Sequence, residues 1–240
     1  MKRGASDVPR YHPRPMQLLL ISSSNVHGYG YLDHPEPEIR KIAGARRSVA
    51  FVPFAAADHD AYTAKVRARL AAMDLDVSQV RDARDIELAD VLFVGGGNTF
   101  RLLKTLYERR LLDPIHERVR AGMPYIGSSA GSNIAAPTIR TTNDMPIVEP
   151  PSFNALGFIP FQLNPHYLDA DPASKHQGET REERLLEFLE ENDVPVVAIR
   201  EASALRVDDD LITLTGDAAA RIFRRGRAPE EVAPGSIVKV

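Results

Sequence analysis

One ten-residue stretch constrains the fold of this chain more than any other, the segment from Pro124 to Asn133 (PYIGSSAGSN). Apolar residues there lead into a Gly-x-Ser-x-Gly pattern, in which Gly127 and Gly131 flank Ser129 at two positions on either side. This pattern is typical of a nucleophile elbow, a sharp turn between a strand and a helix that holds a serine in a strained backbone conformation above a sheet. Glycine suits both positions because a β-carbon would collide with neighbouring backbone.

The elbow motif alone is short, and its residue types are common enough for chance matches. Ser128 and Ser132 are nearby hydroxyls, but only Ser129 has glycine at both −2 and +2. A helix starting after Ser129 would direct free N–H groups and a partial positive charge towards a reacting group. The stretch therefore predicts a nucleophile and half of an oxyanion hole, and the rest of the chain has to supply a base and an acid.

Composition excludes several other classes of protein. The chain has 240 residues, a net charge of −3 with mixed signs, and no cysteine. We therefore expect no nucleic-acid partner, no disulfide and no thiolate metal site. No run approaches the roughly 18 apolar residues of a membrane span, so we expect a cytoplasmic protein without membrane contact. Residues 1–15 are polar with three prolines and are predicted to be a disordered extension before a single catalytic domain at 16–240.

Apolar runs alternate with helical patterns along most of the chain. Runs at 16–21, 48–54, 75–80, 90–94 and 194–199 predict strands, and the spacing at 60–73, 99–112, 113–121 and 180–191 predicts helices. Segments 22–37 and 138–161 are expected to be largely loops, and short β-prone runs at 204–207, 211–214, 220–223 and 236–240 predict an antiparallel edge. This alternation predicts an α/β fold, a three-layer αβα arrangement around a mostly parallel sheet.

A glycine loop, Gly95-Gly96-Gly97-Asn98, follows the strand expected at 90–94 and opens a helix. It is neither a dinucleotide fingerprint, which would need glycine at Phe100, nor a P-loop, which needs Gly-Lys-Ser/Thr. One interpretation is a tight strand-to-helix turn. The other is that its N–H groups face the elbow, so that Gly97, or next Gly96, completes an oxyanion hole with Ala130.

Two histidines are candidates for the general base. His166 follows an apolar stretch, as at the end of a strand, and is favoured over His176, which lies in a polar segment. The Asp58-His59-Asp60 run could hold a metal, but a solvated loop is the favoured interpretation.

The carboxylate that would orient the histidine can come from either of two chain orders. The order Ser, acid, His of α/β-hydrolases would use Asp144 or Glu149. The order Ser, His, acid would use Glu201, which follows an apolar strand at the place where sites assemble in parallel sheets.

Several longer motifs resemble the peptidase E family of serine peptidases, also called α-aspartyl dipeptidase or dipeptidase E. In chain order, they lie at Gly95–Phe100, Tyr125–Asn133, Pro137–Val148, Asn164–His166 and Gly178–Glu182. The resemblance runs from about Gln17 to the last strands. It implies a fold related to class I glutamine amidotransferases rather than to α/β-hydrolases.

The resemblance also implies site residues. The family's Ser-His-Glu triad falls on Ser129, His166 and Glu201, with no metal or cofactor. Two departures are visible. Ser128 stands where the family often has an aromatic residue, which bears on the pocket wall, and Ala202 stands where a glycine commonly follows the acid.

The family activity implied is cleavage after an N-terminal aspartate, mainly in dipeptides, by a monomer or homodimer. The pocket must then hold a carboxylate, for which arginine is suited because it binds two oxygens at once. Arg140 and Arg181 are the candidates, together with Asn98 of the glycine loop as a substrate-binding residue, whereas a surface ion pair is the alternative for Arg181. Asp144 or Glu179 could meet the substrate amino group. Competing functions are a cyanophycinase-like hydrolase of β-aspartyl bonds, an esterase, and a non-enzymatic binding module.

Overall fold

A seven-stranded sheet forms the centre of the molecule in the computed structural model, which describes residues 15–173, 175 and 177–240. Its strands are β1 (Gln17–Ile21), β2 (Ser48–Val52), β3 (Asp76–Gln79), β4 (Val91–Val94), β5 (Tyr125–Ser128), β8 (Ser203–Asp208) and β9 (Leu211–Gly216). They lie in the order β3-β2-β4-β5-β1-β8-β9. The first five are parallel, and β8 and β9 add an antiparallel edge next to β1.

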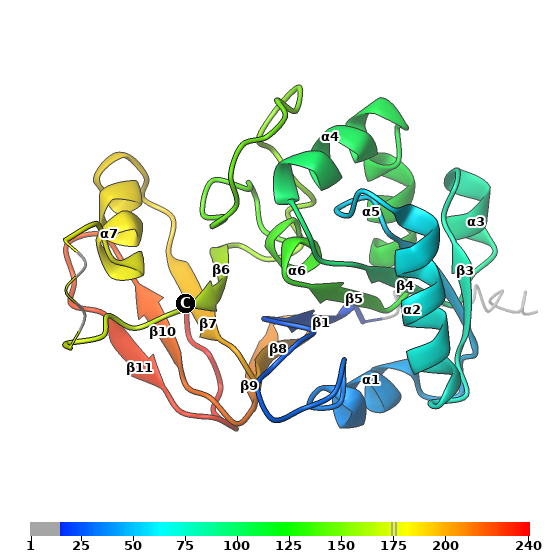
Figure 1. Ribbon diagram of the computed structural model, residues 1–240, viewed down its shortest axis with the longest axis horizontal. Coiled ribbons are helices and arrows are strands. Elements are labelled where there is room, and N and C mark those ends of the chain that lie inside the picture. The colour runs from blue at the N-terminus through cyan, green and yellow to red at the C-terminus, as the bar shows by residue number, and fades with distance from the viewer. Residues whose placement is uncertain (1–14, 174, 176) are drawn as a thin grey trace, which may run out of the picture.

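Helices cover both faces of this sheet (Figure 1). One face carries α1 (Glu36–Ala43) and α2 (His59–Ala71), and the other carries α3 (Ala83–Glu87), α4 (Thr99–Glu108), α5 (Leu112–Arg120) and the short α6 (Ala130–Asn133). Alternate residues of β1 serve the two layers, since Leu18 and Leu20 pack in one core cluster and Leu19 and Ile21 in the other. This explains why the central strands are apolar throughout, and the predicted three-layer α/β fold is confirmed.

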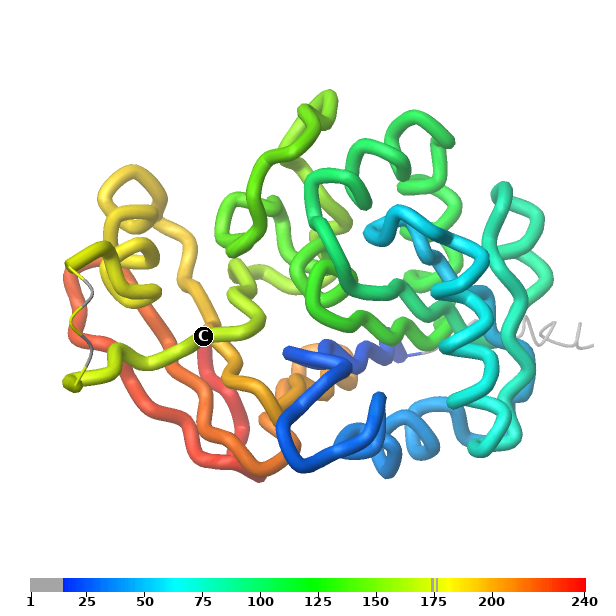
Figure 2. Tube along the Cα trace, viewed as in Figure 1, coloured from blue at the N-terminus to red at the C-terminus, as the bar shows by residue number. Residues whose placement is uncertain are grey.

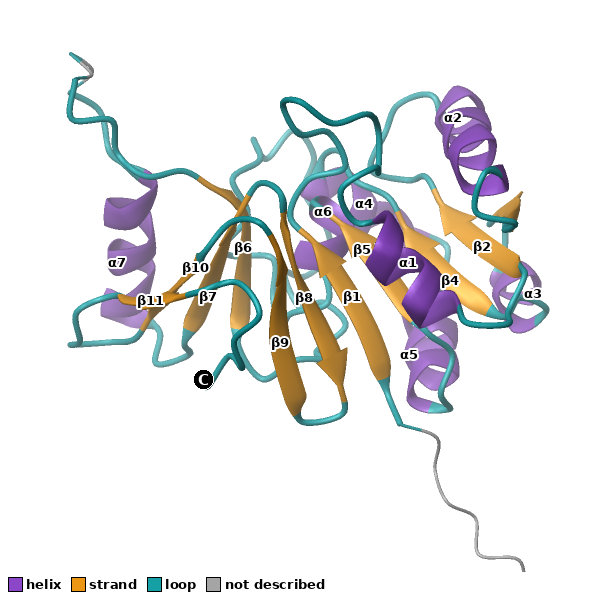
Figure 3. Cartoon of the chain, turned by 90° about the horizontal axis from the view of Figure 1, so that it is seen from below, coloured by secondary structure: helices purple, strands orange, loops and turns teal. Residues whose placement is uncertain are grey.

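A second, four-stranded sheet stands beside the first (Figure 3). It contains β6 (Gln162–Tyr167), β7 (Val196–Arg200), β10 (Ala220–Phe223) and β11 (Glu230–Val232), in the order β11-β10-β7-β6, with β6 and β7 parallel. Helix α7 (Arg181–Glu191) packs on its outer face through Leu185 and Leu189. The inner face of the second sheet joins the main core through Leu163, Val197 and Ile199.

The second sheet is the main difference from the sequence-based expectation. The strand predicted at 194–199 is present as β7, but it belongs to this sheet, and so does β10, which was expected at the edge of the main sheet. The run at 236–240 forms only an isolated bridge between Thr213 and Ile237. Periodicity reveals that a strand exists but not which partner it pairs with, because pairing is decided by contacts distant in sequence.

Two further segments differ from the prediction. Helix α1 begins inside the stretch expected to be a loop, with Pro37 in its first turn, a position where proline is compatible with a helix. The loop between α6 and β6 rises beside α4 (Figure 2) and is held there by hydrogen bonds to Asn98 and Thr99. Residues 1–14 of the predicted N-terminal extension lie outside the described part of the chain, so that prediction and the predicted single domain stay predictions.

Tyr125 provides a test of the packing beneath the elbow. Its fully buried hydroxyl donates to the Gly131 carbonyl. We expect Tyr125→Phe to lower the free energy of unfolding by about 1–3 kcal/mol, because a buried acceptor loses its partner. Tyr107→Phe is the matched control, since its hydroxyl bonds the Asn154 carbonyl at an exposed position. Urea unfolding of both variants measures the difference, and equal losses would contradict this account.

Candidate active site

Ser129 stands at the carboxyl end of β5, where the backbone turns into α6 with φ 54° and ψ −111°. Such a conformation costs a non-glycine residue of the order of 1–3 kcal/mol and is tolerated where the surroundings enforce it. The surroundings are tight, since a β-carbon on Gly127 would lie 2.6 Å from the Gly131 carbonyl oxygen, and one on Gly131 would clash with the Val94 carbonyl. The expected elbow geometry is therefore present around Ser129.

His166 reaches Ser129 because β6 is irregular at this point. The register between β6 and β7 shifts between Pro165 and Tyr167, so that His166 is the extra residue of a bulge, with φ 56°. A bulge bends its strand and redirects a side chain. Here the imidazole Nε2 lies 2.8 Å from Ser129 Oγ.

Glu201 contacts the other nitrogen of the same ring. Its Oε1 lies 3.0 Å from His166 Nδ1, at the two-residue turn that connects β7 of one sheet to β8 of the other. The next residue, Ala202, has φ 62°, a conformation in which glycine carries no steric penalty. The Glu201 side chain is 52% exposed, so water screens its charge.

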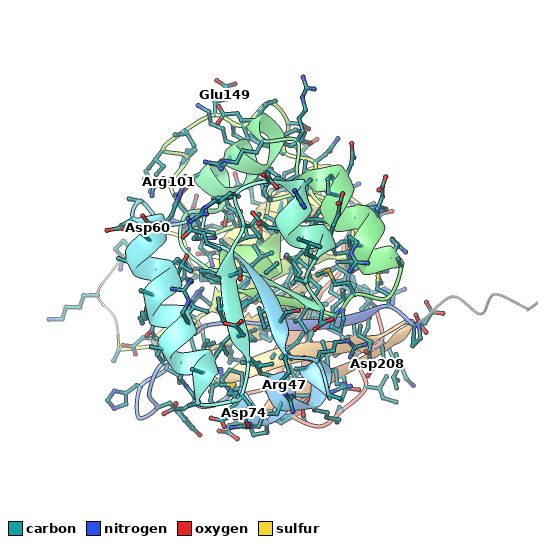
Figure 4. All side chains as sticks on the ribbon, turned by 90° about the vertical axis from the view of Figure 1, so that its right-hand side faces the viewer. Arg47, Asp60, Asp74, Arg101, Glu149 and Asp208 are labelled. Carbon is teal, nitrogen blue, oxygen red and sulfur yellow. The ribbon has the colours of Figure 1, made fainter. Side chains whose placement is uncertain are left out.

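The alternative acids lie elsewhere. Asp144 Oδ2 accepts hydrogen bonds from the backbone N–H of Thr99 at 2.7 Å and from its hydroxyl at 2.6 Å, at the start of α4. Glu149 is exposed on the loop before β6 (Figure 4). Within the described residues, neither carboxylate hydrogen-bonds His166, and His176 lies outside them.

Ser22 connects the two halves of the site. Its hydroxyl, fully buried at the end of β1, donates to the Ile199 carbonyl at 2.9 Å and accepts the His166 backbone N–H at 2.9 Å. One side chain of the main sheet thus holds both β6 and β7 of the second sheet. This interaction fixes the backbone of His166 relative to Ser129.

The glycine loop approaches the elbow closely, since a β-carbon on Gly96 would lie 2.9 Å from Ser129 Cβ. The Gly96 N–H is already used, because it donates to the Tyr62 hydroxyl at 2.9 Å. By contrast, the N–H groups of Gly97 and Ala130 have no acceptor among the described residues. Both residues line space beside Ser129, so the geometry favours Gly97 over Gly96 as the second oxyanion donor.

Two hollows flank the nucleophile. The larger, about 310 Å³, is lined by residues after β1, by Tyr31, by Tyr62 and Lys65 of α2, and by Gly97. Burial is the first cause that raises the pKa of Tyr31 and of Tyr62, so both phenols stay neutral. The smaller hollow is lined by Ala130, Asn143 and Asp144. Ser128 is fully buried in the sheet and lines neither hollow.

The predicted substrate-binding residues differ in their positions. The pKa of Arg181 is lowered, first by burial and then by the charge of Arg184, while nearby Asp144 opposes the shift. Arg140 stacks on Phe153, 5.2 Å from the ring centroid, in a groove that contains no triad residue. Asn98 caps α4 by accepting the Arg101 N–H and donates to the Met145 carbonyl, so both ends of its side chain are engaged.

Sequence reasoning missed Ser22, Tyr31, Tyr62 and Lys65. Ser22 was visible as the first of three serines ending a strand, but a serine there is equally typical of a loop. Tyr62 was expected on the buried face of a helix, and only the fold shows that this helix also borders the nucleophile. Asp60 near the start of α2 and Asp74 after its end mark how that helix lies along the molecule (Figure 4).

No group of three or more metal-ligating side chains occurs in residues 15–173, 175 and 177–240. Over the same residues, no helix is both long and apolar enough to cross a membrane.

A serine on a strained elbow, a histidine at hydrogen-bond distance, a carboxylate behind it and free N–H groups beside it define the class of serine hydrolases with a three-layer α/β fold. The family model of peptidase family S51 matches residues 18–215. The chain therefore belongs to peptidase family S51, and it is a serine peptidase.

Relatives of known name agree with this assignment. The chain is 57% identical to "Peptidase E" of Streptomyces coelicolor, over 92% of this chain and 93% of that protein. It is 48% identical to the "Probable alpha-aspartyl dipeptidase" of Drosophila melanogaster, over 90% and 93%. A crystal structure of a peptidase from an acI-B1 Actinobacterium has the same fold, with a TM-score of 0.71 and 18% identity, over 96% of this chain and 99% of that one.

The role of Ser22 in positioning His166 can be tested separately from its contribution to stability. Ser22→Ala leaves the Ile199 carbonyl and the His166 N–H unpaired, so we expect a loss of about 1–3 kcal/mol in unfolding free energy. We also expect slower labelling of Ser129 by a fluorophosphonate, because the imidazole is no longer fixed.

Ser132→Ala is the matched control for this prediction, since its buried hydroxyl bonds the Ile21 carbonyl at 2.7 Å without touching His166. The control should lose stability but keep the labelling rate. Equal labelling rates in the two variants would contradict a positioning role for Ser22.

Proposed function

We propose that this chain hydrolyses the peptide bond after an N-terminal aspartate in Asp-X dipeptides, through an acyl-enzyme on Ser129. The observation that carries the proposal is the continuous contact from Ser129 through His166 to Glu201, at 2.8 and 3.0 Å. The names of the relatives supply the substrate class. No metal or cofactor enters the mechanism.

His166 Nε2 takes the proton from Ser129 Oγ as that oxygen attacks the scissile carbonyl. Glu201 accepts a hydrogen bond from Nδ1–H, orients the ring and stabilises the imidazolium. The oxyanion is bound by the N–H groups of Gly97 and Ala130, and one such donor is worth about 3–4 kcal/mol in known enzymes. His166 then protonates the leaving amine, and water repeats the cycle on the ester.

The strained backbone contributes to this chemistry directly. Ser129 cannot relax away from the imidazole, because the Ser129 N–H donates to the Ile21 carbonyl at 3.0 Å and the elbow glycines are packed against backbone. The nucleophile and its base are therefore held at hydrogen-bond distance before substrate binds, which lowers the entropic cost of reaching the transition state.

The substrate aspartate would be recognised near the smaller hollow. Asp144 supplies the carboxylate of this hollow, and its Oδ2 accepts hydrogen bonds from Thr99 and Thr142. This carboxylate suits the ammonium group of the substrate. Arg181 lies close enough to Asp144 for their charges to interact, and it suits the β-carboxylate. Arg140 and Asn98 remain weaker candidates, because their side chains already have partners within the protein.

Release of free aspartate from Asp-Leu tests the reaction. Wild type should cleave it and Ser129→Ala should not, while Glu201→Gln should lower kcat by the order of 10⁴-fold, the loss seen when a triad carboxylate is removed. β-Asp-Leu and a p-nitrophenyl ester distinguish the cyanophycinase-like and esterase alternatives. A fully active Glu201→Gln would remove Glu201 from the triad and return the acid to the other chain order.

The proposed role of Arg181 predicts that replacing it weakens the binding of only those substrates that carry the β-carboxylate. Arg181→Ala should raise KM for Asp-Leu about tenfold or more, the typical worth of a charge-assisted hydrogen bond, and leave Asn-Leu nearly unaffected. Arg184→Ala is the matched control, since that side chain is exposed and lies 3.5 Å from Glu179 in a surface ion pair. A steady-state comparison of both substrates gives the answer, and equal losses on them would remove Arg181 from this role.

A further inference from the structure

The larger hollow beside Ser129 has an uneven distribution of charge. Its lining contains the ammonium group of Lys65 and the imidazole of His166, but no carboxylate. The carboxylate of Asp144 lines the smaller hollow instead, which also borders Ser129. An anionic group is therefore favoured in the larger hollow and an ammonium group in the smaller one.

The Lys65 ammonium is held in place without being neutralised. It lies 3.9 Å from the centroid of the Tyr31 ring, a cation–π contact that favours this position and leaves its N–H donors available. Within the described chain, no carboxylate lies within 4.0 Å of it. The lysines at 41 and 104, by contrast, are each paired with a glutamate on their own helix.

Helix α2 presents this lysine to the reaction centre together with Tyr62. The two residues are three apart and so share one face of the helix. Tyr62 accepts the Gly96 N–H, so the same face that carries Lys65 is fixed to the glycine loop beside Ser129. The helix that carries Lys65 is thereby hydrogen-bonded to the loop beside Ser129.

A dipeptide has a charge in the matching place. Its second residue, which leaves as the free amino acid, carries a carboxylate one residue beyond the scissile bond, and one residue of extended chain spans about 3.3–3.6 Å. A hollow of about 310 Å³ is at the small end of the range for ligand sites. It has room for one amino-acid residue rather than for a long peptide.

We propose that Lys65 binds the C-terminal carboxylate of the leaving residue, so that the larger hollow is a subsite for a free amino-acid end and selects dipeptides by length. This inference rests on the proposed function. It also assigns the direction of the substrate, with the aspartyl residue towards Asp144 and Arg181 and the leaving residue towards α2.

The test compares Asp-Leu with Asp-leucinamide, which lacks only the terminal negative charge. Wild type should prefer Asp-Leu in kcat/KM by about tenfold, the lower end of what a hydrogen bond to a charged group is worth. Lys65→Met keeps the length of the side chain and removes the charge. It should lower kcat/KM for Asp-Leu by about tenfold and change Asp-leucinamide less than about twofold.

Lys104→Met is the matched control, because Lys104 lies on another helix and pairs with Glu108 at 3.8 Å. It should behave as wild type on both substrates. Lys65→Arg should restore part of the preference. Because residue 65 is exposed, the thermal unfolding of Lys65→Met should match that of wild type, which separates binding from folding.

Each other outcome overturns the inference. Equal losses on both substrates would mean that Lys65 binds the aspartyl β-carboxylate or supports the loop instead. An unchanged preference in Lys65→Met would mean that Lys65 does not contact the carboxylate. If wild type cleaves neither compound, the proposed function fails together with the inference, whereas a wild type that cleaves both with an unaltered Lys65→Met overturns the inference alone.

Discussion

The hydrogen bonds of Ser22 hold the candidate site together, because Ser129 and His166, the proposed nucleophile and base, belong to different sheets. Ser129 follows β5 of the main sheet, whereas His166 lies in β6 and Glu201 directly follows β7 of the second. Ser22 directly follows β1, the neighbour of β5, and bonds to the backbone of both second-sheet strands. A rotation between the sheets would break these bonds in a buried place where water cannot replace them, so the sheets keep a fixed relation.

Backbone strain occurs at or next to each member of the proposed triad. Ser129 and His166 have φ of 54° and 56°, and Ala202, next to Glu201, has 62°. Each residue ends or interrupts a strand, which is how a side chain is directed out of a sheet and into the space between two sheets. The glycine that is common in the family after the acid suits the left-handed conformation of Ala202, so this departure costs local strain while the contact between Glu201 and His166 is kept.

The sequence predicted those parts of the site that depend on local geometry. The elbow at Ser129 and the glycine loop are dictated by glycines that allow close backbone approach, and such a requirement is visible in a few consecutive residues. The parts contributed by tertiary contact were not predictable. The second sheet, the bulge at His166 and the place of α2 beside the nucleophile depend on pairings between distant segments, which neither periodicity nor propensity encodes. The choice of Glu201 over Asp144 came from the family resemblance, and residue spacing left it open.

Local geometry and tertiary contact also determine how the charges around Ser129 are arranged. Asp144 is positioned by the first turn of α4, where helix N–H groups favour a negative charge, and Lys65 lies over the ring of Tyr31 in the other hollow beside Ser129. The two charges line different hollows and form no ion pair with each other. A zwitterionic substrate that extends across Ser129 would meet a carboxylate at its amino end and an ammonium at its carboxyl end. In the proposed binding mode, a longer peptide would place its C-terminal carboxylate beyond the reach of Lys65.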